Sequence, residues 1–259
     1  MWESRISRSV RLAAQTPAVR ELLTFYAALL GAQQEVYEGL RAAVGWLPSG
    51  ALERDLPALR ALAPRLLAVV AANAPETLAA EAQRLLQASE SATDQLLLDY
   101  WRAPSDTRFF AKAFLQPYAQ WLIETGARPV DRIPGHGMNL CPHCGAKPQL
   151  SFLHSVEGAR ESGGRSLLCC LCLSAWPFRR VVCAHCGEER PAKLGYFTSP
   201  EYDHVRIEAC DSCGHYIKGI DLTRLGLAVP LVDEVAAAPL DLWAREQGYA
   251  KIELNLVGL

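Results

Sequence analysis

Four Cys-x-x-Cys pairs lie in one short stretch of this chain, and they constrain its fold more than any other feature. All nine cysteines of the 259-residue sequence fall between Cys141 and Cys213. A pair with this spacing forms a tight turn, here called a knuckle, which directs both sulfur atoms at one metal ion, and two knuckles complete a tetrahedral site of the zinc-ribbon or rubredoxin type. Eight thiols therefore suffice for two sites. The expected ligands are Cys141, Cys144, Cys169, Cys172, Cys183, Cys186, Cys210 and Cys213.

The spacing between pairs indicates which of them share an ion. Successive pairs are separated by 24, 10 and 23 residues. Two long gaps around a short one predict a duplicated unit, in which the first two pairs form site one and the last two form site two. A cross-braced arrangement, which joins the first pair with the third and the second with the fourth, is the alternative. The ninth thiol, Cys170, lies inside a knuckle, where side chains turn away from the metal, and we expect it to bind no ion.

The start of the chain argues against a secreted disulfide protein, because it has scattered arginines and no apolar core of a secretory signal. No apolar run approaches the roughly 18 to 20 residues that span a bilayer. We therefore expect a cytoplasmic protein without membrane insertion. The formal net charge is −2, and residues 141–220 carry nine Lys or Arg against eight Asp or Glu. This near balance argues against a nucleic-acid partner.

A change of composition along the chain predicts an α+β protein. Ala and Leu recur with helical spacing up to about residue 125, whereas Cys, Gly and β-branched residues dominate afterwards. We expect a helical bundle domain over 1–126, a linker over 127–139, a tandem rubredoxin-like or zinc-ribbon β domain over 140–225, and a C-terminal helix and tail over 226–259 that pack on the core.

Prolines, caps and apolar periodicity predict the individual elements. Helices are expected from Pro17, from Asp55 through Val70, from Pro75, around 94–101, over 107–124 with a kink or break at Pro117, and over 239–247. Strands are expected over 149–154, 166–168, 180–182, 194–197 and 205–208.

The other polar residues do not indicate an enzyme. Four thiolates fill a tetrahedron and leave no open position for a catalytic water, and the sequence has no nucleophile elbow, phosphate loop or dinucleotide motif. The six histidines all lie in or beside the cysteine region, but eight thiolates already fill both sites, so we expect no histidine ligand. Trp176 is expected to pack beneath the ribbon. Arg180 and Lys218 either offset thiolate charge or lie in solvent.

From Cys141 onward the sequence resembles the FdhE family of formate dehydrogenase accessory proteins. The resemblance rests on CPHCGAKP from Cys141, GRSLLC ending at Cys169, EACDSCGHYIK ending at Lys218, the acidic pair at 233–234, and QGY ending at Tyr249. Cys170 and Ala175 depart from the family pattern.

The resemblance implies a cytoplasmic, chaperone-like assembly factor that binds the catalytic subunit of respiratory formate dehydrogenase. It also implies two metal ions per chain and favours iron, although zinc accepts the same four cysteines. Asp211, Tyr216 and Lys218 match the family motif, which implies a partner-binding or structural role for them. A nucleic-acid-binding zinc ribbon protein and a rubredoxin-like electron carrier are the alternatives. Binding that persists at moderate salt would identify the first, and the colour of a ferric thiolate would identify the second.

Overall fold

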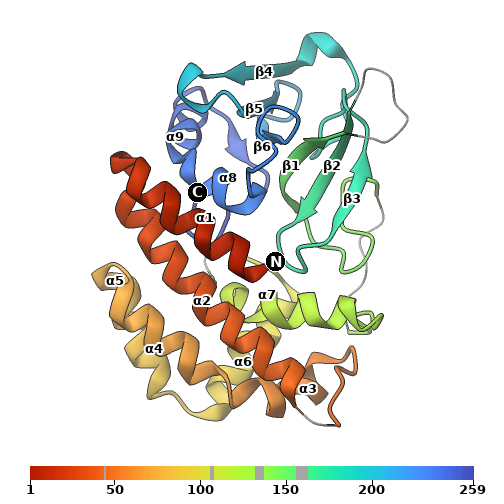
Figure 1. Cartoon of the computed structure of the whole chain (residues 1–259). Helices are drawn as coiled ribbons and strands as arrows, with labels where there is room; N and C mark the ends of the chain where they lie inside the picture. Colours follow the sequence, from red (N-terminus) through yellow and green to blue (C-terminus); the bar gives the residue numbers. More distant parts are fainter. Residues whose placement is uncertain (44, 106–107, 132–136, 156–162) are drawn as a thin grey trace. The chain divides into compact units, whose positions relative to one another are not determined.

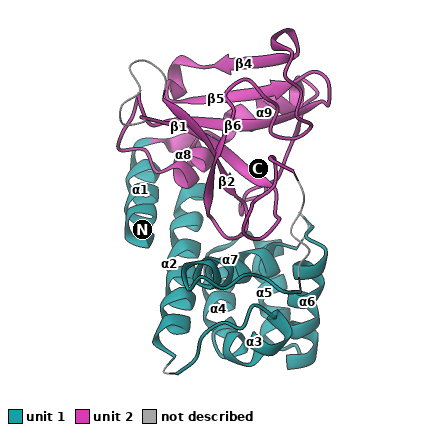
Figure 2. Ribbon diagram, turned by 90° about the vertical axis from the view of Figure 1, so that its right-hand side faces the viewer, with its two compact units in different colours: residues 1–15, 20–134 teal, residues 16–19, 135–259 magenta. Residues whose placement is uncertain are grey.

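The computed structural model describes residues 1–43, 45–105, 108–131, 137–155 and 163–259, and the chain divides into two compact units (Figures 1 and 2). Unit 1 comprises residues 1–15 and 20–134, and unit 2 comprises residues 16–19 and 135–259. Unit 1 is helical, and unit 2 holds the sheet and both groups of cysteines. This confirms the α+β class. In the described part of the chain, none of the helices combines the length and the apolar character that a membrane span requires.

Helix α7 forms the core of unit 1. It is buried from Phe110 to Gln120 and contacts α2, α4 and α6, as expected for a helix that is apolar on nearly all sides. The helices of this unit are α1 (Trp2–Gln15), α2 (Arg20–Ala42), α3 (Leu52–Arg60), α4 (Ala63–Asn73), α5 (Glu76–Leu86), α6 (Glu90–Arg102) and α7 (Phe109–Glu124).

Pro117 lies inside α7 without ending the helix, so of the predicted kink or break the break is wrong. A proline has no N–H and cannot donate to the carbonyl four residues earlier, which here belongs to Ala113. The side-chain amide of Gln33, on α2, donates to that carbonyl at 2.7 Å and to Gln116 Oε1 at 3.0 Å. A neighbouring helix thus supplies the hydrogen bond that the proline removes.

Other helix boundaries also differ from the prediction. The single helix expected from Asp55 to Val70 is two helices, because Pro64 stands in the first turn of α4 and its ring would clash with the Arg60 carbonyl of a continued α3. The helix expected from Pro17 begins as a short 3-10 turn. The arginine-rich start, for which the sequence predicts no helix, forms α1.

Unit 2 is built on one mixed sheet to which both repeats contribute. Its strands are β1 (Pro148–His154), β2 (Gly164–Cys169), β3 (Ala175–Phe178), β4 (Leu194–Thr198), β5 (Val205–Cys210), β6 (His215–Asp221) and β7 (Ala250–Lys251). The order is β3-β2-β1-β6-β5-β4, with β7 beside β6. Each repeat runs knuckle, strand, strand, knuckle, strand, with antiparallel neighbours. Parallel pairing of β1 with β6 joins the two repeats.

The sheet departs from the predicted strands in two places. Residues 180–182 form a turn before the third knuckle, and the strand lies earlier, where Trp176 is opposite Leu167. Strand β6 was hidden from the sequence pattern because it is buried continuously from Tyr216 to Ile220, and a strand covered on both faces shows no alternation. This unexpected strand links the two repeats.

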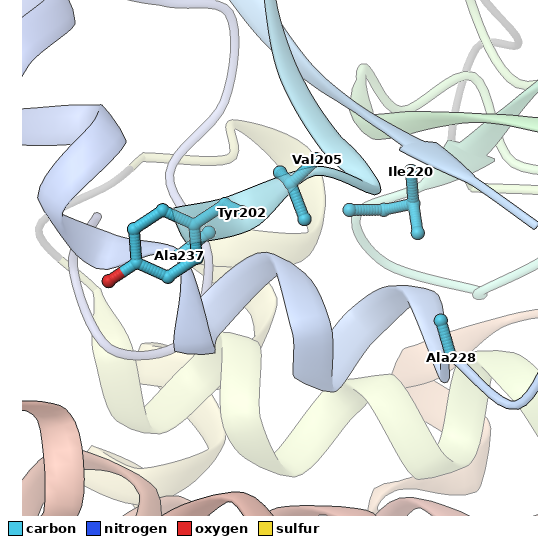
Figure 3. Packing of buried hydrophobic residues seen from close by; sticks show 5 residues of the cluster. All are labelled: Tyr202, Val205, Ile220, Ala228 and Ala237. Carbon is cyan, nitrogen blue, oxygen red and sulfur yellow. The ribbon is translucent and has the colours of Figure 1, made fainter. Parts of the chain in front are cut away.

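Helices α8 (Pro230–Ala236) and α9 (Ala238–Glu246) pack on the sheet of unit 2, and the sequence predicts only α9. Helix α8 contacts β1 and β6, and α9 contacts β5 and β7. Figure 3 shows Val205 and Ile220 over α8, between Ala228 before the helix and Ala237 after it. The C-terminal segment therefore completes the core beneath the strands that carry the knuckles.

Candidate metal centres

All four knuckles use the same local turn. In the first, third and fourth knuckles, the N–H of Gly145, Gly187 or Gly214 donates to the carbonyl of the first cysteine at 2.9, 3.0 and 2.8 Å. These glycines have φ values of 72°, 76° and 67°, a left-handed conformation that suits glycine. In the second knuckle Leu173 holds this position at φ 58°, which costs about 1–2 kcal/mol for a residue with a side chain.

Site one gathers Cys141, Cys144, Cys169 and Cys172 into one cluster. The Sγ atoms of Cys141 and Cys172 lie 3.5 Å apart, and those of Cys144 and Cys169 lie 3.4 Å apart. The backbone N–H groups of Leu171 and Cys172 point at Cys169 Sγ at 3.3 and 3.4 Å, and such donors favour a thiolate. All four cysteines are buried.

Site two gathers Cys183, Cys186, Cys210 and Cys213. Sulfur separations are 3.8 Å for Cys183 with Cys213 and 3.8 Å for Cys186 with Cys210. The backbone N–H groups of His185 and Cys186 point at Cys183 Sγ at 3.3 and 3.5 Å. Cys186 is exposed and Cys213 is partly exposed, so solvent reaches site two and not site one.

The two clusters match the tandem grouping and not the cross-braced one. Their geometry also suits metal coordination, because a tetrahedral ion with metal–sulfur bonds of about 2.3 Å holds its sulfurs about 3.8 Å apart. A disulfide would need about 2.0 Å, and all nine cysteines are free. Four thiolates are a donor set that both zinc and iron accept. That these thiols bind ions stays a prediction.

Thiols of one cluster shift each other's pKa in opposite directions, because a thiolate that forms first repels the negative charge of the next. Burial, reinforced by neighbouring thiols, raises the pKa of Cys169 and of Cys213. The Cys141 thiol raises the pKa of Cys144, whereas hydrogen bonds from Cys144 and other thiols lower the pKa of Cys141. A cation at the centre of each cluster would offset this repulsion and stabilise all four thiolates together.

Cys170 lies outside both clusters, as its place inside a knuckle predicts. It is 3% exposed, and its backbone N–H donates to the Lys147 carbonyl at 3.1 Å. The position is therefore part of the packed core beside site one.

Two histidines lie closer to site two than the sequence predicts. The rings of His185 and His215 stack with centroids 3.8 Å apart and an interplanar angle of 16°. One nitrogen of each ring and Cys213 Sγ lie within 4.8 Å of one another. Burial lowers the pKa of His185, with a further contribution from His215. The signal in the sequence was their position, since one precedes Cys186 directly and the other follows Cys213 by two residues. His136 lies outside the described residues.

The motif residues Tyr216 and Lys218 belong to a buried charge network. Lys218 and Lys251 pair with Glu234 and Asp241, and all four side chains are 0% exposed. Tyr216 Oη donates to Asp241 at 2.8 Å. Burial alone would raise the pKa of Asp241, but the two ammonium groups hold it below its usual value. Lys218 thus neither offsets thiolate charge nor lies in solvent, and its buried ion pairs agree with the structural role that the family motif implies.

The remaining motif residues also make structural contacts. Asp211 accepts a hydrogen bond of 2.7 Å from Tyr249 Oη, which links the fourth knuckle to the QGY motif. Trp176 is 7% exposed and donates to the Met138 carbonyl at 3.0 Å, in agreement with a packing role. Arg180 is exposed. Asp211 thus makes a hydrogen bond at the surface of unit 2, and Trp176 packs within that unit.

Comparisons with known proteins identify relatives over this region and beyond it. Residues 181–257 match the family model described as "FdhE, C-terminal domain". A "Protein FdhE homolog" of Aquifex aeolicus is 40% identical over 151 residues, which cover 58% of this chain and 52% of the relative. The one of Pseudomonas aeruginosa is 33% identical over 158 residues, 58% of this chain and 48% of the relative. In these alignments the chain spans about half the length of the relatives.

Two matches extend over nearly the whole chain. A "Protein FdhE homolog" of Pectobacterium carotovorum is 28% identical over 276 residues, 98% of this chain and 86% of the relative. The crystal structure of the FdhE protein from Pseudomonas aeruginosa superposes with a TM-score of 0.72 at 25% identity, and covers 99% of this chain and 95% of that one. The similarity therefore extends over the helical unit as well as over the unit that holds the cysteines.

Proposed function

Because the chain belongs to the FdhE family of formate dehydrogenase accessory proteins, we propose that it assists the maturation of a respiratory formate dehydrogenase by binding the catalytic subunit in the cytoplasm. Its role is that of a chaperone-like assembly factor and not of an enzyme. The observation that carries the proposal is the pair of four-cysteine clusters on a shared sheet, one of which lies wholly within the residues that match the family model.

Each of the two clusters would hold one ion with its four cysteines. The family favours iron, and the same ligands accept zinc. Bound ions would cross-link knuckles that are far apart in the sequence. Such cross-links contribute folding energy, because the ligands are brought together only in the folded state. We expect about two ions per chain and loss of the fold of unit 2 on chelation. A fully loaded protein with a single ion would contradict this.

A double variant at site two tests the link between metal and function. Cys210→Ser with Cys213→Ser removes two of four ligands, so the site-two ion should be lost, and capture of the catalytic subunit and formate-dependent dye reduction in cells should fall together. Cys170→Ser is the matched control, since it removes a cysteine from the same unit without removing a ligand. Full capture and full activity in the double variant would show that the site is dispensable.

The same cells distinguish the alternative functions. Transcript levels of the dehydrogenase genes should not change in the double variant, and a fall would favour a nucleic-acid-binding role. Metal analysis and visible absorption of the purified protein separate iron from zinc. An iron protein that exchanges electrons at full rate without capturing the subunit would favour an electron carrier.

A further inference from the structure

The two clusters differ in what surrounds their sulfurs. Site one is closed, since its most exposed cysteine, Cys172, is 2% exposed. Within the described ranges, the candidate ligand group at site one contains cysteines alone. At site two, Cys186 is exposed. A second candidate ligand group, formed by His185, Cys213 and His215, shares Cys213 with the four-cysteine cluster. Among the described residues, imidazole nitrogens therefore join a candidate ligand group at site two and not at site one.

The two imidazoles have nitrogens that are suited to bind a metal. His215 Nδ1 lies 2.7 Å from the Cys213 carbonyl, and because a carbonyl only accepts, this nitrogen carries the proton and Nε2 presents its lone pair. A backbone carbonyl that fixes the tautomer of a histidine ligand in this way is typical of metal sites. The Nδ1 atom of His185 is buried without a hydrogen-bond partner within the described part of the protein. Leaving a buried polar atom unpaired costs free energy, which a metal bond would recover.

From this arrangement we propose that His185 and His215 are reserve ligands of site two, which complete the coordination of a thiophilic divalent cation when Cys186 dissociates. The inference rests on the proposed metal binding at site two. After Cys186 leaves, three thiolates remain, and one imidazole completes a Cys₃His set, which is a common zinc ligand set.

The movement that this exchange requires is small. One nitrogen of each imidazole lies within 4.8 Å of Cys213 Sγ, and ligands of one tetrahedral ion lie about 3.3 to 3.8 Å apart. A shift on the order of 1 Å therefore brings an imidazole nitrogen to the distance from Cys213 Sγ at which both can bind one ion. The ion at site two therefore stays bound after Cys186 dissociates, and it can then pass to solvent or to a partner. Site one has no such intermediate, so its ion is either fully bound or lost.

Cobalt(II) loaded into the full chain tests the inference, because its absorption reports both the number of thiolates and the replacement of sulfur by nitrogen. In the Cys186→Ala variant we expect two cobalt ions per chain, with site two weakened about 10- to 100-fold, the range seen for a perturbed ligand shell, and with weaker sulfur-to-cobalt absorption. The matched variant at the closed site, Cys144→Ala, should lose its ion outright. X-ray absorption at the cobalt edge should show nitrogen ligation in Cys186→Ala alone.

A second set of variants removes the reserve ligands and keeps flat rings at the stack. Cys186→Ala combined with His185→Phe and His215→Phe should lose the site-two ion, while the retained site-one ion reports that unit 2 is folded. Equal loss of cobalt from Cys186→Ala and Cys144→Ala would overturn the inference, as would a spectrum that the phenylalanines do not change. A wild-type protein that binds fewer than two ions would instead refute the proposed metal sites themselves.

Discussion

Replacement of Lys218 by methionine tests whether the buried charge network stabilises unit 2. The positive charges of Lys218 and Lys251 balance the negative charges of Glu234 and Asp241, and all four side chains are 0% exposed. Lys218 Nζ lies 3.1 Å from Glu234 Oε1. Lys218→Met leaves one uncompensated negative charge in the core. Breaking a buried pair from one side costs about 3–5 kcal/mol. At about 4 °C per kcal/mol for a domain of this size, the melting temperature of unit 2 should fall by about 12–20 °C.

Hydrogen exchange of the β6 amides across a urea series measures this loss, because it reports on unit 2 separately from the helices of unit 1. The control is the double variant Lys218→Met with Asp241→Asn, which removes one charge of each sign. If charge imbalance is the cause, the double variant should be more stable than the sum of the two single effects by at least about 1 kcal/mol. A single variant that loses less than about 1 kcal/mol, or strictly additive effects, would refute the argument.

Cys170→Ser should leave the metal content unchanged and Cys169→Ser should remove one ion, because only the latter is in a sulfur cluster; metal analysis showing the reverse would overturn the ligand assignment. Gly187→Ala should weaken site two by about 1–2 kcal/mol, since its φ is 76° while no atom lies within 4 Å of an added Cβ; chelator competition measures this, and an unchanged affinity would disprove the backbone argument. The hydrogen bond from His204 to Asp233 raises the pKa of His204 above 6.5, so the charged ring stabilises unit 2 fully below about pH 6.5, and this stability is lost as the pH rises through the raised pKa. His204→Gln should flatten the pH dependence of unfolding in that window, and a wild-type profile in the variant would show that the pair contributes nothing.

Most of the metal-site geometry was predictable because a knuckle is a local structure. All of its features belong to one short segment: two residues separate the cysteines, a left-handed residue follows the second cysteine, and a hydrogen bond closes within five residues. The pairing of knuckles followed from the nearly equal gaps, since a tandem repeat folds each copy alike. Even here Leu173 shows that the backbone conformation, and not the glycine itself, defines the turn.

Contacts between distant segments were decided only by the tertiary structure. The local rule for proline predicts a kink or break at Pro117, yet α7 continues, and Gln33 hydrogen-bonds to the freed carbonyl 80 residues away. The stack of His185 on His215 likewise joins two knuckles that the chain separates by many residues. The partners of Lys218 are Glu234 and Asp241, which come from the two C-terminal helices and not from its own strand. Local spacing encodes which atoms a turn can point at one ion, whereas the partner of a buried donor or charge depends on which surfaces pack together, and that is a property of the whole folded unit.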